Sequence, residues 1–243
     1  MNDRYRGALL GGAWALVLPL LMLCVYTFVF SVVLQGRWQG ANDGGAGFAM
    51  RVFTGMLLFG IFAECVNEAP ALLLSSQSFL KQVLFPSEVL PWVSLLAALW
   101  RFAMGFVLLM IARTLLLGVP PASSLAIPVM LVPMVLLTLG WSWLLSSLGV
   151  FLRDLAQVIT VFTSAAMFLS PVFYPASRIP EVLRPWLFLN PLATILEAAR
   201  PALFDGKLPD WNALALTTIG TFAFAWLGHA WFVRAKPGFA DVL

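Results

Sequence analysis

Long apolar stretches separated by short polar breaks dominate the chain. A membrane-spanning helix needs about 20 predominantly apolar residues, and six stretches fit this requirement, the fifth continuing into the region after it. They cover roughly residues 9–34, 52–74, 89–112, 125–150, 155–170 and 211–233. The breaks between them predict a Gly-rich loop at 35–51, a polar segment at 75–88, a turn at 113–124 and a reversal at Arg153-Asp154. The pattern predicts an all-α membrane protein with six transmembrane helices in a single domain, 1–243.

The stretch 171–200 interrupts this pattern. It contains five prolines: Pro171, Pro175, Pro180, Pro185 and Pro191. Proline lacks a backbone donor and clashes with the preceding turn, so the stretch cannot be one continuous helix. Its aromatic residues argue against an ordinary water-exposed loop. Lipid tolerates irregular backbone only where it is buried in protein or lines a cavity. We therefore expect residues 171–209 to be partly re-entrant, beside a pathway through the membrane.

The composition narrows the function classes. Of 243 residues, 61% are hydrophobic and 10% are charged, whereas a soluble domain is about 25% charged. The apolar stretches leave no room for a separate soluble catalytic domain. No basic run interleaved with aromatic residues suggests nucleic-acid binding. Cys24 and Cys65 fall inside apolar stretches, which favours small core residues over a disulfide or metal site.

The distribution of cations predicts the orientation. With six spans both termini lie on one side, and cytoplasmic loops carry an excess of Lys and Arg. Cytoplasmic termini would put six cations inside: Arg4, Arg6, Lys81, Arg153, Arg234 and Lys236. Seven would lie outside: Arg37, Arg51, Arg113, Arg178, Arg184, Arg200 and Lys207. Four of these seven belong to 171–209, which need not behave as a free loop. Excluding these four leaves six cations inside and three outside. We therefore expect cytoplasmic termini.

No catalytic, metal or nucleotide site is predicted. A P-loop needs Gly-x-x-x-x-Gly-Lys-Ser/Thr, and none of the three lysines (Lys81, Lys207 and Lys236) has that context. Any ATP used must be hydrolysed by another polypeptide. The single His229 is more typical of an interfacial or packing residue than of a metal ligand. The sequence contains no Gly-x-Ser-x-Gly and no His-x-x-x-His.

Two carboxylates and one arginine lie within the spans. Glu64 and Glu68 are four residues apart and share one helix face. Arg101 lies about 18 Å and Glu64 about 15 Å from the expected cytoplasmic ends of their spans. Ionisable groups at mid-membrane usually pair and face the protein interior. We expect a Glu64–Arg101 contact, within or between subunits. One alternative is that either residue faces a polar pathway; another is acid–base chemistry by the two carboxylates.

Aromatic residues on three spans could line a pathway. The candidates are Tyr26, Phe30, Phe59, Phe162, Phe168, Phe173 and Tyr174. Sugar rings stack on aromatic faces, so such a lining would suit a glycan chain; plain helix packing is the alternative.

The polar segment 75–88 is a candidate for partner contact. Phe79, Val83 and Phe85 or Pro86 could form one apolar side of a short helix, with Gln77, Lys81 and Glu88 around it. Such a helix can lie on the membrane or dock into a partner's groove, and its few positive charges favour docking.

Several motifs, in order along the whole chain, resemble the ABC-2-type polysaccharide export permeases. They are RYRGALLGGAWALVLPLLMLCVYTFVFSVVL (4–34), FLKQVLFPSEVLP (79–91), LGVFLRDLAQV (148–158), SPVFYP…IP…NPL…R (170–200) and GFADVL (238–243). The last of these resembles the O-antigen branch in particular. The resemblance implies export of an undecaprenyl-diphosphate-linked polysaccharide across the bacterial inner membrane. The alternatives are an ABC-2 permease for a drug or lipid and, from another class, a membrane enzyme acting on prenyl-phosphate sugars.

The resemblance also implies partners and residue roles. It implies a homodimer with two copies of an ABC ATPase, which bind ATP and Mg, so that this chain holds no cofactor. The segment 75–88 would include a coupling helix, with Phe79, Lys81, Phe85, Pro86 and Glu88 as its contact residues. The region 171–209 would form an external gate, with Pro171, Pro175, Asn190, Pro191 and Arg200 at its centre.

Overall fold

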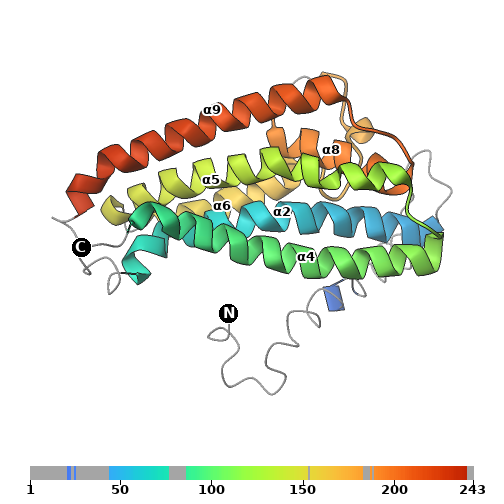
Figure 1. The fold of residues 1–243 in the computed structure, drawn as a ribbon, viewed down its shortest axis with the longest axis horizontal. Coiled ribbons are helices and arrows are strands. Elements are labelled where there is room, and N and C mark those ends of the chain that lie inside the picture. The colour runs from blue at the N-terminus through green and yellow to red at the C-terminus, as the bar shows by residue number, and fades with distance from the viewer. Residues whose placement is uncertain are drawn as a thin grey trace, which may run out of the picture.

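The computed structural model is helical throughout its regular elements (Figure 1). It describes residues 21, 22, 25, 44–76, 86–152, 154–182, 187 and 189–239. The α-helices are α2 (Gly44–Ser75), α4 (Leu90–Leu117), α5 (Ile127–Phe151), α6 (Leu155–Leu169), α8 (Pro191–Phe204) and α9 (Trp211–Ala235). Short 3-10 turns are η4 (Ser87–Val89), η5 (Ala122–Ala126), η6 (Ala176–Arg178) and η7 (Lys236–Phe239). The predicted all-α class is confirmed.

Four helical segments are long and apolar enough to cross a membrane. They are Gly44–Ser75, Ser87–Leu117, Ala122–Phe151 and Trp211–Phe239, which correspond to the expected second, third, fourth and last spans. The expected first span lies outside the described residues except for positions 21, 22 and 25, which are helical. The fifth, α6, has 15 residues. That is about 22 Å of helix, less than the roughly 30 Å hydrocarbon core.

The long helices run alongside one another, so that the bundle has two ends (Figure 1). We call them the Gly44 end and the Ser75 end, after the first and last residues of α2. The Gly44 end carries the last residues of α4 and α8 and the first residues of α5 and α9. The Ser75 end carries the start of α6 and the end of α9.

Helix α5 lies between α9 and α2 and packs extensively against both. Gly140 of α5 and Gly228 of α9 allow this close approach: a Cβ on Gly228 would collide with the Gly140 carbonyl, and one on Gly140 would lie 3.1 Å from the Ala225 Cα. Small residues at helix crossings let backbones touch, which is how helices associate within lipid. The outer faces of α4 and α9 expose large apolar side chains, such as those of Ile111 and Leu216, as lipid contact requires.

The start of α2 differs from the sequence prediction. Residues 35–51 are predicted as a Gly-rich loop, but the helix begins at Gly44, whose φ of 62° suits glycine. Phe48, Ala49 and Met50 are buried. Burial of these side chains overrides the low helix propensity of the glycines.

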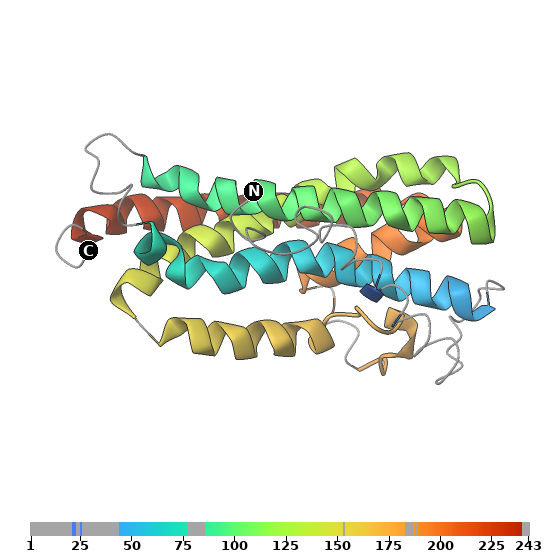
Figure 2. The same ribbon diagram turned by 90° about the horizontal axis from the view of Figure 1, so that it is seen from below.

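Helix α6 lies on the flank of the bundle, beside α2 (Figure 2). Only Ile159 and Thr163 among its residues are buried. The Thr163 hydroxyl donates to the Asn67 side-chain oxygen of α2 at 2.9 Å. Most of the α6 surface is therefore uncovered within one subunit.

Candidate functional site

Helix α8 is a short helix held at the Gly44 end by two buried arginines from other helices. The Arg51 guanidinium of α2 makes two hydrogen bonds to the Asp205 carboxylate, at 2.6 and 3.0 Å, and lies 4.8 Å from the centre of the Phe204 ring. Arg113 of α4 donates from Nε to the Leu203 carbonyl at 2.9 Å. The Arg113 contact satisfies a carbonyl at the end of α8, where backbone carbonyls lack partners within the helix, and Arg51 holds the Asp205 side chain that follows it.

A third buried arginine, Arg200, binds the start of the proline-rich stretch. We call the described residues between 170 and 190 (170–182, 187, 189 and 190) the excursion. The Arg200 guanidinium donates to the Pro171 carbonyl at 2.5 Å and also to the Val172 carbonyl, and its Nε donates to the Arg51 carbonyl at 3.0 Å. Gly55 of α2 makes room for it, because a Cβ there would collide with the guanidinium. Arg200 thus joins α8, α2 and the excursion.

The two ends of the excursion meet at the start of α8. The Asn190 amide donates to the Ser170 hydroxyl at 2.9 Å, and its side-chain oxygen caps α8 by accepting from the Leu192 N–H at 3.0 Å. Asparagine is a preferred N-cap, and Pro191 suits the first helical position. The Glu197 carboxylate accepts from the Ala176 N–H at 3.3 Å.

The predicted gate residues therefore all lie in the excursion or in α8. Pro171 and Pro175 are buried in the excursion, Asn190 and Pro191 begin α8, and Arg200 connects the two. Arg51, Arg113 and Asp205 were missed as members of this group. What could have indicated them in the sequence is their position: each is a charged residue at the boundary between an apolar stretch and a polar break.

The predicted pathway aromatics fall into three groups. Phe168 and Phe173 have ring centres 5.7 Å apart, and the Tyr174 hydroxyl donates to the Phe168 carbonyl at 2.7 Å. Phe162 contacts Trp141 of α5, with ring centres 5.3 Å apart. Phe59 is buried in the core against Phe62 and does not join the others. Tyr26 and Phe30 lie outside the described residues.

Phe168 and Tyr174 of the first group border an open pocket of about 660 Å³ at the end of α6. Its walls include the Phe168 and Tyr174 rings, the Arg178 side chain and Asn190. Aromatic faces beside hydrogen-bonding and cationic groups can hold a sugar ring, and Arg178 adds a donor set suited to anionic groups. The sequence had indicated Arg178 only as one of the cations outside the membrane, and its place in this pocket was not predicted.

The intramembrane charges lie between α2 and α4. Arg101 donates from Nε to the Glu64 carboxylate at 2.7 Å, and a second guanidinium nitrogen lies 2.5 Å from the other carboxylate oxygen. The Ser94 hydroxyl donates to Glu68 at 3.0 Å. The contact expected between Glu64 and Arg101 is thus present within one subunit. Both side chains remain partly exposed, at 24% and 31%.

At the Ser75 end, Glu88 contacts two other helical segments. Its carboxylate accepts from the Lys236 ammonium of η7 at 2.7 Å, and its carbonyl accepts from the Trp143 indole of α5 at 3.1 Å. The Trp143 ring also packs edge-on against His229 of α9. Pro86 precedes this contact in extended conformation. Phe79, Lys81 and Phe85 lie outside the described residues.

Nothing in the described part of the chain brings three metal-ligating side chains together. The arrangement instead combines buried arginines, a folded excursion and two sets of helix-joining polar contacts.

Comparison of the sequence with known proteins identifies relatives of the chain. The chain is similar to the O-antigen export system permease protein RfbA of Myxococcus xanthus, with 25% identity over 243 residues, covering 99% of this chain and 91% of the relative. A protein of the same name from Klebsiella pneumoniae is 26% identical over 245 residues, covering 100% and 91%. The polysialic acid transport protein KpsM of Escherichia coli is 20% identical over 231 residues, covering 95% and 88%.

A family model described as ABC-2 type transporter matches residues 1–204. The match covers most of the chain and includes α2, α4, α5, α6 and α8. The chain therefore belongs to the ABC-2 type transporter family.

Proposed function

We propose that this chain is the permease subunit of an ATP-driven exporter that moves an undecaprenyl-diphosphate-linked polysaccharide, O-antigen, across the bacterial inner membrane. The observation that carries the proposal is similarity along the full chain to relatives named as O-antigen export permeases. Similarity restricted to one helix pair would support only the fold. The permease itself performs no covalent chemistry in this proposal.

The surface of α6 supports a polar pathway beside this helix. Gln157, Thr160 and Ser164 are exposed on it, as is Asn67 on the neighbouring α2. Exposed amide groups at membrane depth are costly against hydrocarbon. The aromatic pocket of Phe168 and Tyr174 continues this surface toward the Gly44 end. A glycan chain offers both the hydroxyl groups and the sugar faces that such a surface can contact.

The two rival functions fit less well. A drug or lipid permease of the same family would suit a narrow aliphatic cleft better than an aromatic pocket bordered by Arg178. A membrane enzyme acting on prenyl-phosphate sugars needs clustered acid–base or metal groups. In the described residues Glu64 and Glu68 are bonded to Arg101 and Ser94, and the relatives are named as permeases.

The assembly proposed here is a homodimer with two ATPase subunits, which bind ATP and Mg. The segment 75–88 is the proposed contact with the ATPase. Glu88 supports this position, because it joins the end of the segment to α5 and η7 through Trp143 and Lys236. ATP-driven movement of the segment would then shift α5 and η7 and open a pathway between the two subunits at the gate.

Cytoplasmic termini are also part of the proposal. Two of the three cations left outside by the sequence count, Arg51 and Arg113, are buried and bonded to α8 and its flank. Buried, paired arginines are not free loop charges of the kind that the positive-inside rule counts. The cation balance therefore favours placing the Ser75 end in the cytoplasm more strongly than the sequence alone did.

Export can be tested by deleting the gene in the source bacterium and measuring O-antigen at the cell surface. We expect surface O-antigen to disappear and the prenyl-linked polymer to accumulate inside, with recovery when the gene is returned. A strain whose partner ATPase carries a substituted P-loop lysine is the control and should show the same phenotype. Unchanged surface O-antigen in the deletion strain would reject the proposal.

A further inference from the structure

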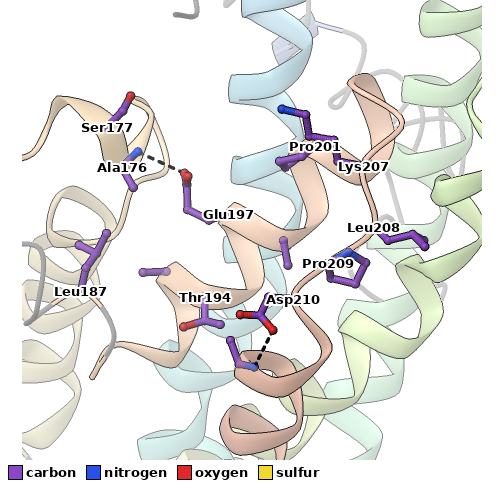
Figure 3. Close-up of a pocket in the computed structure, with 13 residues that line it drawn as sticks. Ala176, Ser177, Leu187, Thr194, Glu197, Pro201, Lys207, Leu208, Pro209 and Asp210 are labelled. Atoms are coloured by element: carbon purple, nitrogen blue, oxygen red, sulfur yellow. Dashed lines mark hydrogen bonds between the residues drawn. The ribbon is translucent and has the colours of Figure 1, made fainter. Parts of the chain in front are cut away.

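A second pocket lies on the other side of the excursion from the aromatic one. It occupies about 540 Å³ between η6, α8 and the connection from α8 to α9 (Figure 3). Leu187 lines both pockets, so the excursion forms a wall between them. The two faces of this wall can therefore meet different molecules.

The walls of this second pocket are mainly aliphatic. Small residues create the space: Ala176, Ala193, Ala198, Pro201, Pro209 and Ala213. None of its described lining residues is aromatic, in contrast to the pocket bordered by Phe168 and Tyr174. Walls of this kind suit a hydrocarbon chain and lack the flat ring faces on which a sugar stacks.

Three charged residues border the space, and they differ in what they already bind. Asp210 caps α9 by accepting from the Asn212 and Ala213 N–H groups. Glu197 accepts from the Ala176 N–H (Figure 3) and also contacts Arg200. Burial raises the pKa of its carboxyl, although Arg200 opposes that shift. The exposed Lys207 ammonium makes no ion pair with any described residue. Of the three charged groups, Lys207 is therefore the one not already engaged by another described residue, and it lies in the same lining as the Asp210 carboxylate.

The surroundings point to the membrane surface. Leu208 and Trp211 are 63% and 48% exposed beside the pocket, at the Gly44 end of the spanning helix α9. Tryptophan and lysine at the end of a membrane helix are typical of the headgroup level, where phosphate groups lie. Hydrocarbon chains are available immediately below this level.

We propose that this pocket binds a membrane phospholipid, with one acyl chain along the aliphatic walls and the phosphate at Lys207. The bound lipid would fill the space between the excursion and α9 and brace the excursion in its folded position. This site goes beyond the proposed export function and does not depend on which glycan is moved.

The proposal can be tested with the complete transporter, including its ATPase, in nanodiscs. The probe is phosphatidylglycerol with a diazirine on one acyl chain; labelled peptides are identified by mass spectrometry. Thr194→Trp, which fills the pocket, should abolish labelling of residues 193–213, and Lys207→Ala should lower it about fivefold, as expected for one lysine facing an anionic headgroup. Matched controls on the α9 surface, Ala223→Trp and Arg234→Ala, should leave labelling unchanged.

Two outcomes would overturn the proposal. Undiminished labelling in Thr194→Trp would mean that the probe reports only lipid around the bundle. Labelling by a diazirine-bearing polyprenyl phosphate but not by phosphatidylglycerol would assign the pocket to the tail of an exported lipid instead. Neither readout uses glycan export, so failure here is distinct from failure of the proposed function. The folded state of each variant is checked by its retention of ATP hydrolysis.

Discussion

Arg200 shows how a charged side chain can be accommodated inside this bundle. Its guanidinium is 1% exposed and donates to three backbone carbonyls, those of Arg51, Pro171 and Val172. The prolines of the excursion interrupt regular backbone pairing, and carbonyls left without partners in an apolar surrounding are costly. A planar fork with five donors on three nitrogens can reach carbonyls of different segments at once, whereas lysine carries its three donors on a single nitrogen.

Replacing Arg200 should therefore destabilise the protein and release the excursion. We expect Arg200→Gln to lower the free energy of unfolding by about 3 kcal/mol, because it leaves buried carbonyls without donors. Thermal unfolding of the purified transporter measures this, with exposed Arg178→Gln as a control that stays within about 0.5 kcal/mol of the parent. Equal unfolding temperatures for the two variants would contradict the assignment.

The Glu64–Arg101 pair allows a charge-exchange test. Glu64→Arg or Arg101→Glu alone places two like charges between α2 and α4, at a cost of about 2–3 kcal/mol. The exchanged double variant should recover most of the lost stability and export. Thermal unfolding and surface O-antigen are the two measurements, and Glu68→Gln, which keeps an acceptor for Ser94, serves as a mild control. If the double variant is as impaired as the single variants, the ion pair between Glu64 and Arg101 does not account for the stability and export that these residues support.

At the scale of elements, the length of the apolar runs predicted more than any motif did. Run length sets where a spanning helix can lie, so the third, fourth and last spans agree with α4, α5 and α9 within a few residues. The interruption at 171–200 follows from proline chemistry and is also present. The predicted start of α2 is too late in the chain. The glycines indicated a loop, whereas the burial that favours a helix there depends on packing against distant residues.

The role of α8 could not be predicted from local pattern. Its last residues are fixed by residues far away in the chain: Arg51 and Asp205 are separated by 154 positions. No periodicity in either segment carries that information. The sequence does supply the local part, the Asn190-Pro191 start of the helix, because capping depends only on neighbouring residues.

Glu88 is better understood as a connector than as a contact of the ATPase. We expect Glu88→Gln and Lys236→Ala to have the same effect: ATP hydrolysis continues while export falls, because η7 no longer follows the segment 75–88. Hydrolysis and surface O-antigen are measured in parallel, with Arg234→Ala as the control.

Phe85→Ala separates the two roles. If Phe85 contacts the ATPase, its replacement should weaken co-purification of the ATPase, whereas Lys236→Ala should leave it intact. Normal export by Lys236→Ala would reject the connector role of Glu88, and loss of the ATPase from that variant would show that η7 is part of the docking surface.

At the scale of the whole molecule, the orientation of the bundle in the membrane depends on which cations count as free loop charges. We expect a membrane-impermeant maleimide to label Ser177→Cys in intact cells and to label Ser75→Cys only after the membrane is opened. Both positions are exposed: Ser75 is the last residue of α2, whereas Ser177 lies in η6 and lines the same pocket as α8. Both variants are made in a background in which Cys24 and Cys65 are replaced by Ala. Labelling of Ser75→Cys in intact cells would reverse the proposed orientation.

The last prediction concerns the uncovered surface of α6. In the membrane this surface must face lipid, a second copy of the chain or a pathway. A thiol at Ser164 should react with a small charged methanethiosulfonate reagent in the assembled transporter if water reaches this surface. A thiol at Leu216 of α9, which is 73% exposed, should not react if that helix faces lipid. Thiolates form and react far faster in water than in hydrocarbon, so the two rates should differ by about 100-fold or more.

Nucleotide then distinguishes a pathway from a static interface. ATP bound to the partner should raise the Ser164→Cys reaction rate if the subunits separate along α6 during transport. Cross-linking of Ser164→Cys to its counterpart in a second copy, with no reaction toward the charged reagent in any nucleotide state, would instead make α6 a closed contact between subunits. In that case the polar groups of Gln157 and Asn67 would serve assembly, and the glycan would have to pass along another helix.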